Sequence, residues 1–243
     1  MQWNGSTTIT DSYNYVKTQD QYHNQIDRKT GRVLPEIDKM AIGEAREFQL
    51  AVLFIDVNGY KDITRGLSNK KILRFLNSYL SEMTQLVRDY DGVVEKYMGD
   101  GITAVFGFDK TPETTVRNAL HCALTMLTVI KYAINPFFSE ISLPNFTCSV
   151  GIDFGDIWLA RTGVHSFSQF SLVGIEVNTA SQLVELAQKN DILLGGEFYE
   201  YLSVEEKGHC IQMTHSSWNW TWRNKQPYPF YRYNAYWKNY PLS

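Results

Sequence analysis

The sequence lacks the features on which membrane, secreted and nucleic-acid-binding proteins depend. No apolar run reaches the roughly 18 residues that a membrane-spanning helix requires. The opening residues, 1–6, are polar and lack the charged-then-apolar plan of a signal peptide. The formal net charge of −3 gives no electrostatic basis for binding duplex nucleic acid. We therefore expect a cytoplasmic protein with neither a membrane nor a nucleic-acid partner.

The chain is also poor in metal-binding and disulfide-forming residues. Its three cysteines are scattered, odd in number and without metal-ligand spacing, and its five histidines show no such spacing either. The cysteines suit a reducing compartment, and we expect them to be buried as small hydrophobic residues: Cys122, Cys148 and Cys210. The histidines are expected to be structural or surface residues: His23, His121, His165, His209 and His215.

What the chain does contain is enough apolar sequence for one core. Its 243 residues, 44% of them hydrophobic, are too few for two large domains. We divide it into a polar N-terminal arm at 1–46, with a candidate helix at 37–47, a compact unit at 47–205 and an aromatic-rich tail at 206–243.

In the tail, three tryptophans alternate with polar residues, which predicts that they share one face of a strand: Trp218, Trp220 and Trp222. Such a face suits either a nucleobase-stacking platform or an amphipathic hairpin that completes a sheet or packs on a second protomer. We favour the hairpin.

Two aspartates at strand ends are the most informative residues. Asp56 closes the apolar run 51–55 and precedes an Asn-Gly turn. Asp100 lies in Met-Gly-Asp-Gly (98–101), which predicts a two-residue hairpin turn. A carboxylate is costly in apolar surroundings unless it is paired or binds a cation. The pair could hold one or two hard divalent cations against a triphosphate.

The remaining pattern predicts alternating strands and helices in the order of a ferredoxin-like fold. The expected elements are a strand at 47–56, a helix at 69–90 capped by Ser68, a hairpin around 98–101, a helix that starts at Thr111-Pro112 and ends before Pro136, strands at 146–153 and 156–162, a strand ending near 173, a helix at 175–189 and a short helix near 196–203.

Three segments in this order resemble the class III nucleotidyl cyclases, which include adenylyl and guanylyl cyclases. They are Phe-Ile-Asp-Val-Asn-Gly-Tyr (54–60), Lys-Tyr-Met-Gly-Asp-Gly (96–101), and Val-Gly-Ile-Asp-Phe-Gly (150–155) followed by Gly-Ile-Glu-Val-Asn-Thr-Ala-Ser (174–181). The likeness covers residues 47–203. It implies an α+β palm domain with a central, mostly antiparallel sheet and packed helices. Diguanylate cyclases share this plan, but their Gly-Gly-Asp/Glu-Glu-Phe turn is absent here.

The resemblance implies roles for residues at the two turns. Asp56, Asp100 and the carbonyl of Val57 would bind two Mg²⁺ or Mn²⁺ ions per site. The backbone amides from Asn58 through Gly59 and Tyr60 to Lys61 would hold phosphate oxygens as a nest.

Two positions would read the base by the same resemblance. Lys96 matches the lysine of adenylyl cyclases, but Ser171 stands where those enzymes carry aspartate or threonine. Guanylyl cyclases use glutamate and cysteine at the two positions. The pair here matches neither set, and serine both donates and accepts hydrogen bonds, so it does not name the base. A pyrimidine is smaller than a purine, so we expect a bulky side chain to narrow a pyrimidine pocket. The candidates are Phe48, Tyr97 and Phe170.

The helix that follows would supply the ribose and phosphate contacts. Asn178 matches the asparagine that positions the ribose. One turn later Gln182 replaces the arginine that stabilises the transition state, so that charge is missing. In the tail, Lys225 or Arg223 would take the place of a triphosphate-binding lysine, and Arg161 is a further candidate with less support.

The combined reading is a class III cyclase that works as a homodimer with two shared sites. The metal aspartates would come from one protomer, and Lys96, Ser171 and Asn178 from the other. The resemblance is greatest to the pyrimidine cyclases of bacterial Pycsar anti-phage systems, with UTP slightly ahead of CTP as substrate and a separate downstream effector for the product. The alternatives are an adenylyl cyclase with a relaxed base site and an inactive cyclase homologue that binds nucleotide or regulates a partner.

Overall fold

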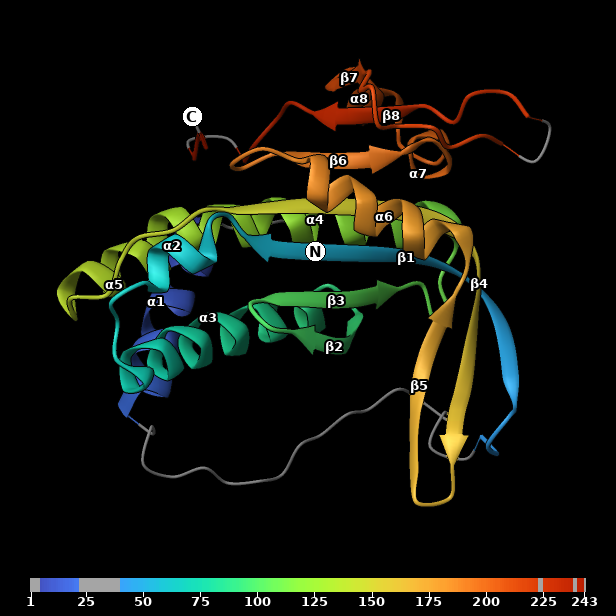
Figure 1. Ribbon diagram of the computed structural model, residues 1–243. Helices are drawn as coiled ribbons and strands as arrows, with labels where there is room; N and C mark the ends of the chain where they lie inside the picture. Colours follow the sequence, from blue (N-terminus) through green and yellow to red (C-terminus); the bar gives the residue numbers. More distant parts are fainter. Residues whose placement is uncertain (1–4, 22–39, 223–224, 238–239, 243) are drawn as a thin grey trace.

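The chain folds around one eight-stranded sheet (Figure 1). The structure, a computed structural model, describes residues 5–21, 40–222, 225–237 and 240–242. Seven strands run in the order β2-β3-β1-β4-β6-β8-β7, and β5 pairs with β4 outside this path. Every pairing is antiparallel except that of β4 with β6. The strands are β1 (Ala45–Val57), β2 (Gly92–Met98), β3 (Gly101–Phe106), β4 (Cys148–Val164), β5 (Phe167–Val173), β6 (Ile192–Gly195), β7 (Cys210–Met213) and β8 (Phe230–Tyr233). The predicted α+β class with a mostly antiparallel sheet is confirmed.

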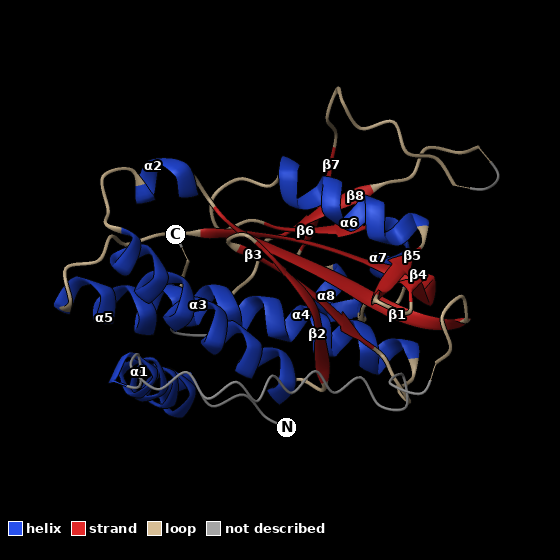
Figure 2. Ribbon diagram, turned by 60° about the horizontal axis from the view of Figure 1, so that its bottom comes forward, coloured by secondary structure: helices blue, strands red, loops and turns tan. Residues whose placement is uncertain are grey.

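Helices cover both faces of the sheet (Figure 2). The helical segments are α1 (Gly5–Gln21), α2 (Tyr60–Thr64), α3 (Asn69–Asp89), α4 (Pro112–Val129), the π-helical turn η2 (Ile130–Ile134), α5 (Asn135–Glu140), α6 (Ile175–Leu186), α7 (Gly196–Glu200) and α8 (Val204–Lys207). Helices α1, α3 and α4 contribute to the large core on one face, and α6 packs on the other.

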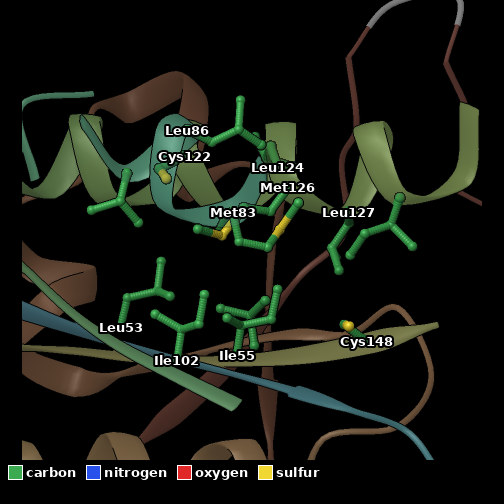
Figure 3. Packing of buried hydrophobic residues seen from close by; sticks show 14 of the residues in the cluster. Leu53, Ile55, Met83, Leu86, Ile102, Cys122, Leu124, Met126, Leu127 and Cys148 are labelled. Carbon is green, nitrogen blue, oxygen red and sulfur yellow. The ribbon is translucent and has the colours of Figure 1, made fainter. Parts of the chain in front are cut away.

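The large core lies between the central strands and α3 with α4 (Figure 3). Leu53, Ile55 and Ile102 of the sheet face Met83 and Leu127 of the helices, and all five side chains are at most 3% exposed. Burying each such side chain contributes about 1.5–3 kcal/mol to folding. Alternate residues of β1 point to the opposite face, which places Asp56 on the side of α6.

The two long helices begin as predicted, because their capping residues act locally. The side chains of Ser68 and Thr111 accept hydrogen bonds from the third residue of α3 and α4.

The predicted end of the second helix before Pro136 is wrong, since Pro136 lies in the first turn of α5 and the helical run continues to Glu140. The π-helical turn before it changes the hydrogen-bond spacing there, and a proline is tolerated at the start of a helix. This run is long and apolar enough to cross a membrane, but most of it is buried within the protein.

The two strands predicted at 146–153 and 156–162 are one strand, β4. All 13 residues of β1 pair with β4, so the partner strand keeps the backbone extended past Gly155. Beyond this pairing β4 continues with β5 as a hairpin that projects from the body of the protein (Figure 1).

Both ends of the chain differ in part from expectation. The candidate helix at 37–47 is wrong for its described residues, because the chain enters β1 at Ala45, which pairs with Ala160; residues 37–39 lie outside the described part. In the arm, α1 packs on the core through the fully buried Val16. The tail does complete the sheet, through β7 and β8.

The three tail tryptophans do not share a strand face. The only pairing found there among the described residues is an isolated bridge between Thr221 and Pro227. Trp218 instead packs on Phe230, with ring centroids 4.6 Å apart, and Trp222 packs on Tyr228 at 4.5 Å.

Candidate active site

Asp56 lies at the exposed end of β1, against the turn that joins β2 to β3. Ile55 pairs with Ile102, which brings Asp56 beside Gly101. A Cβ atom at Gly101 would lie 3.1 Å from Oδ1 of Asp56 and 3.0 Å from the carbonyl oxygen of Ile55. A side chain at position 101 would therefore be crowded, and the carboxylate of Asp56 rests against the residue that follows Asp100.

Asp100 completes the pair from the two-residue turn. Met98 pairs with Gly101 and Gly99 has a φ of 65°, as the predicted hairpin requires. Burial, and then the negative charge of Asp56, raise the pKa of Asp100 to about 6. The backbone N–H of Val57, at the end of β1, opposes this rise in the pKa of Asp100.

The Asn-Gly turn after β1 is held by β4. The side chain of Asn58 donates to Oγ of Ser149 at 3.0 Å and accepts from Oγ1 of Thr147 at 3.1 Å. Its backbone N–H donates to the Thr147 carbonyl, so this amide is not available for a phosphate. Gly59, with a φ of 70°, starts α2, and the amides of Gly59, Tyr60 and Lys61 lie at the beginning of that helix.

The donor set fits a hard divalent cation. Two carboxylates converge, and the negative charge of Asp56 is one cause of the raised pKa of Asp100. Oxygen ligands of this kind suit Mg²⁺ or Mn²⁺. Among the described residues no group of three His, Cys, Asp or Glu side chains could hold a metal ion, so the remaining ligands would be a backbone carbonyl such as that of Val57, water or phosphate oxygens.

Lys96 lies on β2, the edge strand of the sheet. Its ammonium is 3.6 Å from the carboxylate of Glu95, which is only 4% exposed, while the lysine side chain is 47% exposed. The pairing of β2 with β3 shifts register between Val94 and Lys96, so Glu95 is the extra residue of a β-bulge. From Lys96 to Met98 the pairing with β3 is regular again, so these two side chains lie on the same side of β2.

Ser171 lies on β5, in the projecting hairpin. Its hydroxyl is 2.9 Å from Oγ1 of Thr162 on β4, and Thr162 also donates to the carbonyl of Gln169 at 3.4 Å. Phe170 is the preceding residue of β5 and therefore faces the other side, where it and Phe48 pack against the buried Met40 and Leu159. Neither ring shares the face of Ser171 within one chain.

The third aromatic candidate is also engaged elsewhere. The Tyr97 hydroxyl hydrogen-bonds Oγ1 of Thr84 at 2.8 Å, while its ring is 53% exposed.

Helix α6 carries Asn178 and Gln182 across the sheet. It crosses β4 at Gly151, where any Cβ atom would collide with the backbone of Ala180 and Val184. Asn178 is exposed. Gln182 is already bonded to the tail: its Oε1 accepts from the indole N–H of Trp220, and its Nε2 donates to the Ser217 carbonyl at 3.4 Å.

The basic residues considered for binding the triphosphate are spread over the tail and the β4–β5 hairpin. Lys225 is exposed in a turn, with a φ of 66°, and its N–H donates to the Trp222 carbonyl; Arg223 lies outside the described residues. Arg161 donates to the Met40 carbonyl at 2.7 Å and to Oγ of Ser168 at 3.2 Å. Within one chain, Asp56 and Asp100 therefore lie close together. The other three candidates lie on separate elements: Lys96 on β2, Ser171 on β5 and Asn178 on α6.

One buried group escaped the sequence reasoning. Asp153, in the middle of β4, is 1% exposed, and both of its oxygens lie 2.9 Å from the hydroxyl of Tyr228. Burial raises its pKa well above the ordinary value. The signal was present in the sequence, since an aspartate inside the apolar run 148–154 must find a partner.

Comparison with known proteins agrees with this architecture. The family model described as the adenylate and guanylate cyclase catalytic domain matches residues 44–218. An adenylate cyclase of Anabaena cylindrica is 28% identical over 194 residues, 76% of this chain and 37% of that protein. A cytidylate cyclase of Staphylococcus aureus is 25% identical over 182 residues, 72% of this chain and 43% of that protein. The chain thus spans about two fifths of the length of these relatives.

Solved structures share the fold. The guanylyl cyclase Cya2 superposes with a TM-score of 0.68 at 18% identity, over 84% of this chain and 100% of that one. The adenylyl cyclase CyaB from P. aeruginosa gives 0.67 at 22%, over 82% and 99%. The family model alone covers well over half of the chain. This chain therefore belongs to the class III nucleotidyl cyclase family.

Proposed function

We propose that the protein converts a pyrimidine nucleoside triphosphate to a 3′,5′-cyclic mononucleotide and pyrophosphate. The observation that carries the proposal is the convergence of Asp56 and Asp100 where β1 ends beside the β2–β3 turn. In the reaction the ribose 3′-oxygen bonds to the α-phosphorus, the bond to pyrophosphate breaks in line, and the 3′-proton passes to solvent.

The residues of this chain would bind and orient the triphosphate. Asp56 and Asp100 would hold two Mg²⁺ or Mn²⁺ ions, with the Val57 carbonyl as a further ligand. Bound metal of this kind neutralises the pyrophosphate and favours attack by the 3′-oxygen. The amides of Gly59 and Tyr60 at the start of α2 would donate to phosphate oxygens.

We further propose a homodimer with two shared sites. Lys96, Ser171 and Asn178 lie on other elements than the aspartates, and β5 projects from the body in a hairpin that can reach a second protomer (Figure 1). Exposed apolar side chains on and beside that hairpin favour such a contact: Trp158, Val164, Val173 and Ile175. In the dimer, Asn178 of one protomer would orient the ribose of a nucleotide held by Asp56 and Asp100 of its partner.

For the base, a pyrimidine is favoured because the pair of Lys96 and Ser171 matches neither the adenylyl nor the guanylyl cyclase set. The sequence alone places UTP slightly ahead. Similarity to cytidylate cyclases of S. aureus and Escherichia coli, at 25–26% identity, now favours CTP. The resemblance to the Pycsar cyclases would make the cyclic product a signal in bacterial anti-phage defence that acts on a separate effector.

Two other functions have specific support. The relative from Anabaena cylindrica, with 28% identity, is an adenylate cyclase. An inactive, nucleotide-binding role is supported by Gln182, which carries no charge and is bonded to Trp220. A solved relative of P. aeruginosa is described as an adenylyl cyclase-like ATP-binding protein, with a TM-score of 0.66 at 17% identity.

The deciding experiment incubates the purified protein with ATP, GTP, CTP or UTP in the presence of Mn²⁺ and identifies the products by mass. Cyclic CMP or cyclic UMP, absent in Asp56→Asn, supports the proposal. Cyclic AMP alone would establish an adenylate cyclase. Binding of a triphosphate without turnover of any of the four would establish the inactive alternative.

A further inference from the structure

Helix α6 carries Asn178 and Gln182 on the same face. The two residues are four positions apart, so they lie one helical turn, about 5.4 Å, from each other along the helix axis. Asn178 is exposed and Gln182 is half-buried. In the proposed function Asn178 orients the ribose. Gln182 is then close enough to reach the phosphates of the same nucleotide.

The tail holds Gln182 by the oxygen of its side-chain amide. The indole N–H of Trp220 donates to Oε1 of Gln182. An indole can only donate, so its partner is the amide oxygen and the NH₂ group is left at the other end. That group donates one N–H to the Ser217 carbonyl in a long hydrogen bond of 3.4 Å. Within the described residues, the second N–H of Gln182 thus remains for a ligand.

Trp220 is itself held against the centre of the sheet. Its carbonyl accepts from the backbone N–H of Tyr228 at 2.9 Å. The hydroxyl of Tyr228 lies 2.9 Å from the carboxylate of Asp153, in the middle of β4, and accepts from the N–H of Glu197 at 2.8 Å. The indole therefore has a fixed place relative to the sheet, and it passes this placement on to the side chain of Gln182.

We propose that Trp220 is a positioning residue for the cyclisation, an inference that rests on the proposed function. Its indole N–H holds the oxygen of the Gln182 amide, so that the NH₂ group faces the phosphates. A hydrogen bond to a charged phosphate oxygen is stronger than one between neutral groups, so Gln182 supplies part of what the arginine it replaces would provide. Without the indole N–H the amide can turn over and present its oxygen, which the phosphates repel.

The test compares Trp220→Phe, which keeps an aromatic ring and removes the N–H, with Gln182→Ala and with the double variant. Binding is measured by isothermal titration with the 3′-deoxy forms of the four nucleoside triphosphates, which lack the attacking hydroxyl and are not turned over. Turnover is measured with the intact triphosphates. We expect each single variant to weaken binding, and to lower kcat/KM, by about tenfold. The double variant should be no worse than Gln182→Ala, because Trp220 acts only through that amide.

Trp218→Phe is the matched control. It removes the indole N–H of a neighbouring tail tryptophan, whose partner is the Tyr228 carbonyl at 2.7 Å, and it should bind and turn over the nucleotide as the wild type does. Melting temperatures identify any variant that fails to fold. Gln182→Ala keeps the test decisive if Trp220→Phe does, since wild-type binding by Gln182→Ala alone would overturn the proposal.

The outcomes separate this inference from the proposed function. Losses of Trp220→Phe and Gln182→Ala that multiply in the double variant would overturn the positioning role, even in a protein that cyclises a triphosphate. Non-additive losses of binding, with no turnover of any intact triphosphate, would support the placement of Gln182 by Trp220 and overturn the cyclase function. Failure of the wild type to bind any triphosphate would overturn both.

Discussion

The hydroxyl of Tyr228 lies 2.9 Å from both carboxylate oxygens of Asp153, although 75 positions separate the two residues in the chain. Tyr228 belongs to the aromatic tail and Asp153 to β4, so this contact joins the last quarter of the chain to the centre of the sheet. Both residues also line a cavity of about 420 Å³ between β4, α6 and the tail.

Tyr228→Phe tests this connection. The substitution keeps the ring and removes the hydroxyl, which leaves a buried carboxyl without that partner. We expect the free energy of unfolding to fall by about 1–3 kcal/mol in chemical denaturation. Tyr236→Phe, at a tyrosine that is 48% exposed, should change it by less than about 0.5 kcal/mol. Equal effects of the two substitutions would show that the contact contributes nothing to stability.

Asp56→Asn and Asp100→Asn should each reduce cyclic nucleotide formation by at least about 100-fold, because each removes a charged metal ligand. Folding should not suffer: at pH 7.5 the two carboxylates repel each other, so either variant should unfold at the same denaturant concentration as the wild type or a higher one. Asp62→Asn, at an exposed aspartate of α2, is the matched control. Near-normal activity in either site variant would contradict the metal assignment.

Mixing two inactive proteins tests the shared site. Asp56→Asn and Asn178→Ala should both be nearly inactive alone. After subunit exchange, half of the dimers are mixed and each has one intact site, so about a quarter of wild-type activity should return. Exchange is followed by native mass spectrometry of differently tagged chains. Proven exchange with no recovered activity would place the site within one chain.

Ser171→Asp tests the base assignment. A carboxylate only accepts hydrogen bonds, so it should repel the ring carbonyls of uracil and tolerate the amine of cytosine. We expect kcat/KM for UTP to fall by about tenfold more than that for CTP. Ser171→Asn, which can donate, should not discriminate in this way. An unchanged ratio of the two substrates would show that Ser171 does not contact the base.

The burial of Glu82 leads us to expect that its contribution to stability depends on pH. This α3 residue is 2% exposed, bonds to Ser12 of α1, and has its pKa raised by burial to about 7. Its folded-state pKa exceeds the unfolded value of 4.5, so the unfolded chain releases this proton first as pH rises. Glu82 therefore contributes most to stability below pH 4.5; its contribution falls between about pH 4.5 and 7 and is then constant, a loss of roughly 3 kcal/mol at most.

The measurement compares thermal unfolding of Glu82→Gln with the wild type at pH 5 and pH 8. The variant has no proton to lose, so its gain in stability relative to the wild type should be larger at pH 8. Glu185→Gln, at an exposed position of α6, should show no such difference. A gain that is independent of pH would rule out ionisation of Glu82 as the cause.

The sequence by itself determined the local features of this protein. The cap at Ser68, the apolar stripe of α3 and the Gly99-Asp100 turn are all encoded within a few neighbouring residues, because helix periodicity and turn conformation depend on near neighbours. The same is true of the strand that ends at Asp56. These features placed the two aspartates at strand ends, whereas the mostly antiparallel sheet was implied by the resemblance to the cyclase family.

Only the tertiary structure decided the features that depend on distant partners. Pairing with β1 made β4 a single strand. Two tail tryptophans packed on β8 and on Tyr228 instead of forming one face of a strand. The indole of Trp220 formed a hydrogen bond with the side chain of Gln182. The partner of Asp153 likewise had to come from the tail. Each outcome depends on which chemically suitable group arrives in three dimensions, and residue spacing along the chain does not contain that choice.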